Sequence, residues 1–226
     1  MPSPVAVAAV VFDNDGLLLD TEVAWTRAET RLFAGYGRTF TPADKRALIG
    51  TSHHVAAATL TELLDQPGRG EDLVQELYVL VHEEASVGID PRPGAVALLD
   101  AVDAAGLPVA VASNSLRSFL DIALASAGLA GRFVTTISGD EVAEPKPAPD
   151  LYLEACRRLG VGPAEAVALE DSPTGVASAR AAGLRVIGVP YLPELADQLA
   201  TDLVARRLDD VEVLAFLGLD PPRRAS

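Results

Sequence analysis

The sequence predicts an α/β protein whose core is a doubly wound parallel sheet, with an α-helical domain inserted into it. Three observations support this prediction. Short apolar runs rich in valine, alanine and isoleucine recur along the chain, helical stretches that end in glycine separate them, and one long segment near the N-terminus has helical patterns only.

Five short runs are predicted to be buried strands, because they are apolar on both faces and do not alternate with polar residues. They cover residues 5–12, 109–113, 133–138, 166–170 and 185–189. Strands of this kind are typical of a parallel sheet that has helices on both sides.

The helical stretches between these runs end in glycine, the residue that most easily adopts the left-handed conformation after a helix. The glycines concerned are Gly106, Gly128, Gly160 and Gly183. Alternating strands and helices predict right-handed crossovers in an open sheet, whose ligands bind beyond the carboxyl ends of the strands.

Residues 20–92 break this alternation, because they contain four helix-like stretches and no credible strand. We expect them to form a helical cap domain, with residues 1–19 and 93–226 forming the α/β core domain. The insert leaves the core directly after Asp15, so we expect it to rise from the carboxyl edge of the sheet, where it can close over a site.

Composition argues against several classes of partner. The formal net charge of −14 and the pI near 4.5 disfavour nucleic acid, because arginines and lysines gather only in pairs. No stretch approaches the roughly 18 apolar residues of a membrane span. The single cysteine, Cys156, lies among helix-spaced apolar residues, which predicts a core thiol in a reducing compartment. We expect a cytoplasmic protein, a monomer or homodimer, that binds neither membrane nor nucleic acid.

Polar side chains follow four of the predicted strands. Three groups come directly after a strand, and the fourth lies in the loop after the strand 133–138. Each group alone has an ordinary explanation as a helix cap, a turn or a solvated loop charge. Together, at one edge of one sheet, they indicate a functional site. The groups are Asp13, Asn14, Asp15 and Gly16; Ser113, Asn114 and Ser115; Lys146; and Glu170, Asp171 and Ser172.

This combination of side chains suits the transfer of a phosphoryl group. Clustered carboxylates need a counter-ion, and oxygen ligands with one or two acidic groups suit Mg²⁺. A hydroxyl, backbone N–H groups at a helix start and a lysine ammonium can neutralise phosphoryl oxygens. One carboxylate can act as nucleophile and form an aspartyl phosphate, while a second carries out proton transfer.

The same residues resemble the signature of the haloacid dehalogenase superfamily, in its branch of phosphoglycolate phosphatases and beta-phosphoglucomutases that carry a helical cap. The resemblance rests on "FDNDGLLLDTE", "VASNS", "EPKPAPDLYLEA" and "ALEDSPTGVASARAAG", which follow the family's order and spacing over nearly the whole chain. It implies a Rossmann-like core and Mg²⁺-dependent phosphoester chemistry.

The resemblance also implies roles for single residues. Asp13 would be the nucleophile and a metal ligand, and Asp15 the general acid and base, with its carbonyl on the metal. The remaining implied roles are phosphoryl binding for Ser113 and Asn114, charge stabilisation for Lys146, and metal binding for Asp171 and Glu170.

Departures from the family pattern bear on the reaction. Asn14 stands where an apolar residue is usual, and in an extended backbone it points away from both aspartates. The mutases resemble this chain at Thr21, but they place a histidine where Trp25 stands and a cap arginine where His53 aligns. Dehalogenases lack the second aspartate, so Asp15 argues for phosphate esters.

The sequence therefore predicts a phosphatase of small phosphorylated metabolites, such as a sugar phosphate or phosphoglycolate. Thr21, Trp25 and His53 are candidate substrate contacts, although Trp25 equally fits a core position on an amphipathic helix and His53 a solvated helix start. The alternatives are a phosphosugar mutase and, from other classes, a receiver-like signalling module or a binding protein. Receiver modules have about half this length, and they have no cap.

Overall fold

The computed structural model describes residues 6–48, 51 and 53–219. The chain divides into two compact units, which are Met1–Asp20 with Asp90–Ser226, and Thr21–Ile89. The first unit contains the sheet, and the second contains helices only within its described residues.

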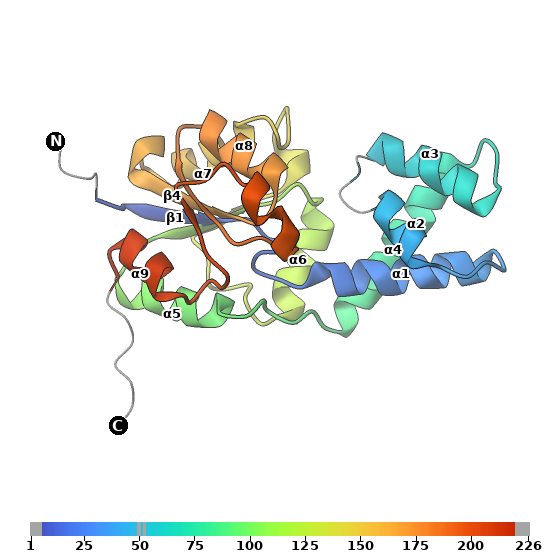
Figure 1. The fold of residues 1–226 in the computed structure, drawn as a ribbon, viewed down its shortest axis with the longest axis horizontal. Helices are drawn as coiled ribbons and strands as arrows, with labels where there is room; N and C mark the ends of the chain where they lie inside the picture. The colour runs from blue at the N-terminus through green and yellow to red at the C-terminus, as the bar shows by residue number, and fades with distance from the viewer. Residues whose placement is uncertain (1–5, 49–50, 52, 220–226) are drawn as a thin grey trace, which may run out of the picture. The chain divides into compact units, whose positions relative to one another are not determined.

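The sheet of the first unit has six parallel strands within the described residues (Figure 1). Their order, β3-β2-β1-β4-β5-β6, is that of the Rossmann fold, which confirms the predicted fold class. The central strand β1 pairs with β2 on one side and with β4 on the other, so the carboxyl ends of these three strands are neighbours. The strands are β1 (Ala9–Phe12), β2 (Val109–Ala112), β3 (Thr135–Ile137), β4 (Ala166–Glu170), β5 (Arg185–Gly188) and β6 (Leu203–Val204).

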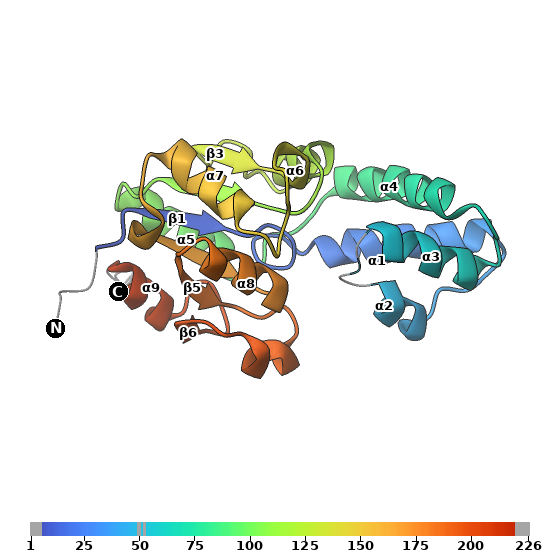
Figure 2. The same cartoon turned by 90° about the horizontal axis from the view of Figure 1, so that it is seen from above.

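Helices cover both faces of this sheet. In Figure 1, α7 and α8 lie over one face and α5 and α9 over the other, and Figure 2 shows the same unit from above. Three short 3₁₀ helices, Gly139–Glu141, Pro163–Glu165 and Pro193–Gln198, complete the connections. The α-helices are α5 (Ala95–Ala104), α6 (Arg117–Ser126), α7 (Asp150–Leu159), α8 (Pro173–Ala181) and α9 (Val211–Leu217).

The glycines predicted to end the helices adopt the left-handed conformation. Their φ angles are positive, at 67° for Gly106, 71° for Gly128, 72° for Gly160 and 90° for Gly183. A side chain with a Cβ is strained at such angles, so each glycine stops its helix and redirects the chain toward the next strand.

Two elements of this unit were not predicted from the sequence. Strand β6 has only two residues and α9 only seven, which is too short for a periodic pattern to emerge. The predicted strands were also too long, since β1 begins at Ala9 and β3 covers only Thr135–Ile137. Just outside these bounds, the N–H groups of Ala8 and Val134 still donate to the carbonyls of Glu165 and Val109. Periodicity alone cannot place the residue at which a strand begins or ends.

One core cluster fills the space between the sheet and the helices α7 and α8. It combines strand residues such as Val11 and Ala112 with Leu151, Tyr152 and Cys156 of α7. Cys156 is 2% exposed, and burial raises the pKa of its thiol to about 11, so the predicted core thiol is confirmed.

The second unit consists of the helices α1 (Thr21–Gly35), α2 (Pro42–Leu48), α3 (His53–Leu64) and α4 (Gly70–Val87). Helix α4 packs against both α1 and α3. The core of this unit is mainly aliphatic, with Leu32, Leu60, Leu73 and Val81 buried, and it also contains the ring of Phe33. All four helix-like stretches of the insert are therefore helices.

Candidate active site at the carboxyl edge of the sheet

The end of β1 places two aspartates in different surroundings. The backbone of Asp13 continues the ladder, because its N–H donates to the carbonyl of Leu169 at 3.0 Å. Gly16 then turns the chain with a φ of 84°, and a Cβ at this position would lie 2.5 Å from Oδ2 of Asp171. Only glycine therefore lets this loop approach the acidic end of β4 so closely.

The second aspartate, Asp15, is bound by two serines that follow β2. Ser113 Oγ and Ser115 Oγ both donate to Oδ2 of Asp15, at 2.8 and 2.9 Å. Oδ1 of the same carboxylate is buried and has no hydrogen-bond partner among the described residues. One oxygen of Asp15 is thus anchored, and the other is left for a proton or a ligand.

Asn114 is bound to the loop that carries the lysine. Its side-chain Nδ2 donates to the carbonyl of Lys146 at 3.1 Å, and its Oδ1 accepts from the N–H of Lys146 at 2.8 Å. These two bonds fix the backbone of Lys146 against the end of β2. Because both amide atoms are engaged, a contact from Asn114 to a phosphoryl group has to come from its backbone N–H.

Lys146 lies in a buried ion-pair network. Its ammonium is 2.5 Å from Oδ1 of Asp13 and 2.6 Å from Oε1 of Glu170. The hydroxyl of Tyr152 also donates to Oε1 of Glu170, at 2.5 Å. Glu170 is 0% exposed, and Gly175 in the first turn of α8 makes room for it, since a Cβ there would overlap its carboxylate.

Three carboxylates at this edge can share a cation. Asp13, Glu170 and Asp171 each offer an oxygen, and these oxygens lie within 4.8 Å of one another. The carboxylate of Asp15 is not part of this cluster. The donor set consists only of oxygen atoms, which suits a hard divalent ion such as Mg²⁺.

The electrostatics of the cluster show an excess of negative charge. Burial raises the pKa of Asp13 to about 8; Lys146 opposes this rise, and Glu170 and Asp15 add to it. Burial together with Asp13 and Glu170 raises the pKa of Asp171 well above its ordinary value. Although burial lowers the pKa of Lys146, Asp13 and Glu170 raise it above its usual range. One ammonium thus faces several carboxylates, and a cation would compensate the remainder.

Asn14, between the two aspartates, is fully buried, and neither its Oδ1 nor its Nδ2 has a hydrogen-bond partner among the described residues. An unsatisfied buried amide costs about 1–3 kcal/mol. The structure gives no contact that explains why an amide stands here.

The three candidate substrate contacts belong to the helical unit. Thr21 begins α1 and is buried, and Trp25 is half-buried, with its ring edge-to-face on Tyr78 at a centroid distance of 5.8 Å. The backbone of His53 begins α3, whereas its side chain lies outside what the structure describes. Their part in substrate binding stays a prediction.

One residue of the network was missed in the sequence, and one was given no role. Ser115 was included in the polar group after the second strand, but its bond to Asp15 was not predicted. Tyr152 has the spacing of a core residue on a helix, and only its hydroxyl hints at a polar partner.

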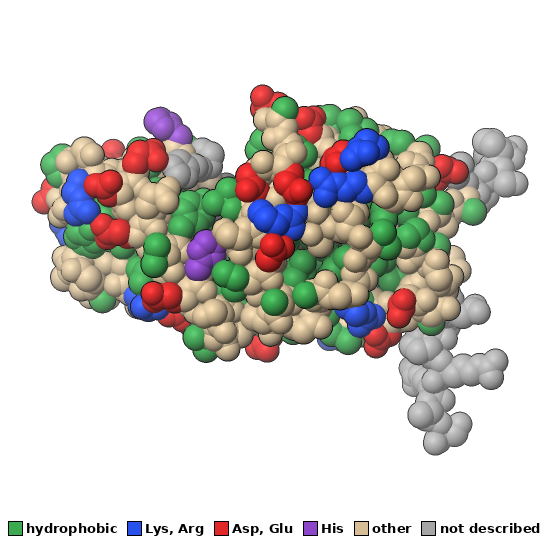
Figure 3. All heavy atoms as spheres, turned by 180° about the vertical axis from the view of Figure 1, so that it is seen from behind, with side chains coloured by type: hydrophobic (Ala, Val, Ile, Leu, Met, Phe, Trp, Pro, Cys, Tyr) green, Lys and Arg blue, Asp and Glu red, His purple; other side chains and the backbone are tan. Residues whose placement is uncertain are grey.

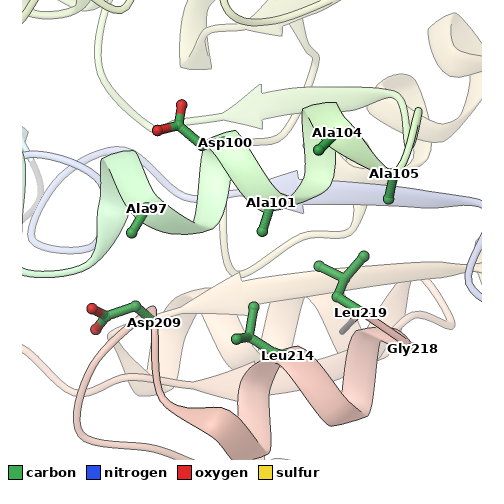
Figure 4. A pocket seen from close by; sticks show the side chains of 9 residues that line it. All are labelled: Ala97, Asp100, Ala101, Ala104, Ala105, Asp209, Leu214, Gly218 and Leu219. Carbon is green, nitrogen blue, oxygen red and sulfur yellow. The ribbon is translucent and has the colours of Figure 1, made fainter. Parts of the chain in front are cut away.

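Within the described part of the chain, no second group of clustered metal-ligating side chains was found. A cavity of about 690 Å³ lies between α5 and α9, and its lining is mostly alanine and leucine (Figure 4). Its two acidic residues are already paired, Asp100 with Arg132 and Asp209 with Arg207. On the face shown in Figure 3, basic side chains lie beside acidic ones and form no continuous basic patch. Among the described residues, no helix is long and apolar enough to span a membrane.

Comparisons with known proteins agree with this site. A profile of the family described as haloacid dehalogenase-like hydrolase matches residues 10–189. The bifunctional riboflavin kinase/FMN phosphatase of Arabidopsis thaliana is 32% identical over 209 residues, which are 89% of this chain and 55% of that protein. The phosphorylated carbohydrates phosphatase of Thermotoga maritima is 32% identical over 188 residues, which are 81% and 85% of the two chains.

The fold is also found among solved structures. CbbY from Rhodobacter sphaeroides, determined in complex with phosphate, has a TM-score of 0.78 to this chain at 30% identity, covering 94% of this chain and 100% of that one. This chain therefore spans about half of the first relative and most or all of the other two proteins.

Proposed function

This chain belongs to the haloacid dehalogenase-like hydrolases, and from that premise we propose that it is a phosphatase that hydrolyses small phosphorylated metabolites through an aspartyl phosphate on Asp13. The observation that carries the proposal is the separation of two neighbouring carboxylates. Asp13 faces Lys146 and the candidate cation cluster, whereas Asp15 is held by two hydroxyls and keeps one oxygen unbonded.

In the first step, a carboxylate oxygen of Asp13 attacks phosphorus and the bond from phosphorus to the ester oxygen breaks. The protonated Asp15 gives its proton to the leaving oxygen, so that an alcohol departs and not an alkoxide. Lys146 at 2.5 Å from Asp13 stabilises the negative charge that develops on the phosphoryl oxygens. The Asn114 backbone N–H adds a hydrogen bond to the same group, whereas the single proton of the Ser113 hydroxyl is donated to Asp15.

In the second step, water attacks phosphorus and gives its proton to Asp15, now in its carboxylate form. The bond from phosphorus to Asp13 breaks, inorganic phosphate leaves and the Asp13 carboxylate is restored. Asp15 ends the cycle with the proton that the next substrate needs. The hydrogen bonds from Ser113 and Ser115 keep it in one orientation during both transfers.

The donor set fits a divalent cation, and we propose Mg²⁺. One oxygen from each of three carboxylates lies within 4.8 Å of the others. The pKa values of Asp13 and Asp171 are raised first by burial and then by the neighbouring carboxylates. Asp13, Asp171 and the Asp15 carbonyl would hold the ion, and Glu170 would act chiefly through Lys146, because two donors already occupy its Oε1. When bound, the ion supplies positive charge that offsets the phosphoryl oxygens.

The substrate class comes from the relatives. The names of two relatives state activity on FMN and on phosphorylated carbohydrates, and the CbbY structure contains phosphate. A phosphorylated sugar or a similarly small organic phosphate is therefore the first substrate to test, and phosphoglycolate belongs in the same panel.

The test is a phosphate-release screen of the purified protein against sugar phosphates, including beta-glucose 1-phosphate, and against phosphoglycolate, glycerol phosphate, FMN and a phosphoprotein. Each assay is run with Mg²⁺ and with a chelator. Metal-dependent release from a few small substrates supports the proposal. Isomerisation of the sugar phosphate without net release would instead identify a mutase, and release from the phosphoprotein alone would overturn the substrate class.

A further inference from the structure

Tyr152 is a buried aromatic residue with a polar group that packing does not require. It lies on α7, is 0% exposed and belongs to the same core cluster as Val11 and Ala112. A phenylalanine ring would fill nearly the same volume, so the hydroxyl needs a separate explanation.

The hydroxyl contacts the ion pair behind the catalytic aspartate. It donates to Oε1 of Glu170 at 2.5 Å, within the range of about 2.5–2.7 Å expected when a hydroxyl bonds to a carboxylate. Lys146 donates to the same oxygen at 2.6 Å, and its ammonium lies 5.1 Å from the centre of the Tyr152 ring. Tyr152 therefore contacts both members of a buried ion pair.

Glu170 and Asp13 compete for the same ammonium. The two distances from Lys146 differ little, at 2.6 and 2.5 Å, so the charge of the lysine is shared between them. A hydrogen bond from Tyr152 fixes Oε1 and takes up part of its negative charge, which weakens the pull of Glu170 on Lys146. In a buried site with a low effective dielectric constant, such a redistribution is felt strongly.

We infer that Tyr152 is a positioning residue for phosphoryl transfer, whose hydroxyl holds Glu170 so that the Lys146 ammonium stays directed at Asp13. This inference rests on the proposed function. It gives Lys146 two anchors, because Asn114 fixes its backbone and the Tyr152–Glu170 pair fixes its side chain.

The state of the hydroxyl agrees with this role. Burial and the charges of Glu170 and Asp13 raise the pKa of Tyr152 well above its ordinary value. This direction favours the protonated hydroxyl, which is the form that can donate to Glu170.

The experiment compares Tyr152→Phe with the wild-type protein in three measurements: kcat and KM for the best substrate of the screen, the affinity for inorganic phosphate by calorimetry, and the melting temperature. We expect kcat to fall about tenfold, equivalent to about 1.4 kcal/mol, with KM changed less. Phosphate should also bind several-fold more weakly. A lower melting temperature with unchanged kcat and phosphate affinity would mean that the hydroxyl is only structural, and would overturn the inference.

The matched control is Tyr36→Phe in the helical unit. The Tyr36 hydroxyl also donates to a carboxylate, that of Glu76, at 2.8 Å, so the same chemical change removes the same kind of bond. We expect kcat and phosphate affinity to stay at the wild-type level. An equal loss of kcat in both variants would contradict a specific role for Tyr152.

A double-mutant cycle tests whether Tyr152 acts through Glu170. Glu170→Gln retains shape and an acceptor oxygen but removes the negative charge that competes for Lys146. If the inference is correct, adding Tyr152→Phe to Glu170→Gln changes kcat much less than it does in the wild type. Full additivity would overturn it. Should Tyr152→Phe fail to fold, a fall in kcat of tenfold or more in Glu170→Gln would overturn the inference, because removing the competing charge should leave the Lys146 ammonium directed at Asp13.

Failure of the proposed function has a different signature. A wild-type protein that releases no phosphate from any substrate would reject the phosphatase assignment itself. A wild-type enzyme that is active while Tyr152→Phe matches it in every measurement would reject only the inference about Tyr152.

Discussion

The carboxyl edge of the sheet and the helical unit use charged side chains in different ways. At the sheet edge, Asp13, Lys146 and Glu170 are 6%, 8% and 0% exposed. In the helical unit, the pair of Arg31 and Glu83 has side chains that are 45% and 55% exposed. Among the described residues both units contain ion pairs, but the sheet edge gathers three carboxylates, those of Asp13, Glu170 and Asp171, near the ammonium of Lys146.

The buried charges at the sheet edge are better explained by function than by a contribution to the stability of the fold. Taking charges out of water costs several kcal/mol per ion, and a buried pair is weak evidence for stability. Among its described residues the helical unit buries one carboxylate, that of Glu29, and the ammonium of Lys45 lies 2.9 Å from it and 2.8 Å from Glu22. The sheet edge keeps uncompensated charge, which fits a site that binds a cation and a phosphoryl group. Substitutions at the edge should therefore change activity, and those of exposed pairs should change little.

The largest effect is expected from Asp13→Asn, which removes the proposed nucleophile but preserves its shape. Turnover should fall on the order of 10⁴-fold or more, while the circular dichroism spectrum stays that of the wild type. The matched control is Asp140→Asn, which follows another strand of the sheet and lies outside the carboxylate cluster. Phosphate release close to wild type in Asp13→Asn would show that the nucleophile is misassigned.

Asp15→Asn should have the next largest effect, because proton transfer enters both steps. The expected loss is about 10²–10⁴-fold in kcat, the usual contribution of general acid–base catalysis. The loss should be smaller for a substrate whose leaving group is already acidic, such as an aryl phosphate. Equal losses for aryl and alkyl phosphates would speak against the role of Asp15 as general acid.

Stability of the metal-free protein should depend on pH through the same carboxylates. The pKa of Asp13 is raised to about 8 from an ordinary 3.8, so between these values the folded state binds more protons than the unfolded state. Stability therefore falls as pH rises through this window. Urea denaturation in chelator at pH 5, 6.5 and 8 measures the slope, and Mg²⁺ should restore stability at pH 8.

Asp171→Asn sharpens this test, because it removes one of the clustered charges. The metal-free variant should be more stable than the wild type at pH 8, by on the order of 1 kcal/mol, and it should bind Mg²⁺ more weakly. A wild-type stability that stays flat or rises from pH 5 to pH 8 would contradict the excess of negative charge.

Asn14→Leu is expected to stabilise the protein by about 1–3 kcal/mol with activity retained, because it removes an unsatisfied buried amide. Asn114→Leu is the matched control, since both amide atoms of Asn114 bond to the backbone of Lys146, and this variant should lose stability and activity. Both are measured by urea denaturation and phosphate release. A destabilised Asn14→Leu would reveal a partner for Asn14.

The smallest effect is expected from Arg31→Ala in the helical unit, which removes an exposed ion pair with Glu83 and a partly exposed one with Glu84. We expect no measurable change in melting temperature, because exposed pairs contribute little. Arg117→Ala should lower it more, since this guanidinium also bonds to the carbonyl of Thr136 in β3. A larger fall in melting temperature from Arg31→Ala than from Arg117→Ala would contradict the difference drawn between the two regions.

The sequence by itself determined the fold class and the location of the site. Buried apolar runs, glycines after helices and polar residues after strands are local patterns, and parallel strands bring their carboxyl ends to one edge. Asp13, Ser113 and Glu170 could therefore be assigned to one site without knowing any contact. The short elements β6 and α9 could not be predicted, because they are too brief for periodicity to emerge.

Only the tertiary structure decided which polar groups pair. It showed that Ser113 donates a hydrogen bond to Asp15 and that the Asn114 side chain bonds to the backbone of Lys146. It also showed that the Tyr152 hydroxyl donates to Glu170. Lys146 and Asp13 are separated by 133 positions, yet their side chains meet at 2.5 Å. Such pairs depend on rotamers and on distances set to within a few tenths of an ångström by packing, and local sequence patterns carry no information at that scale.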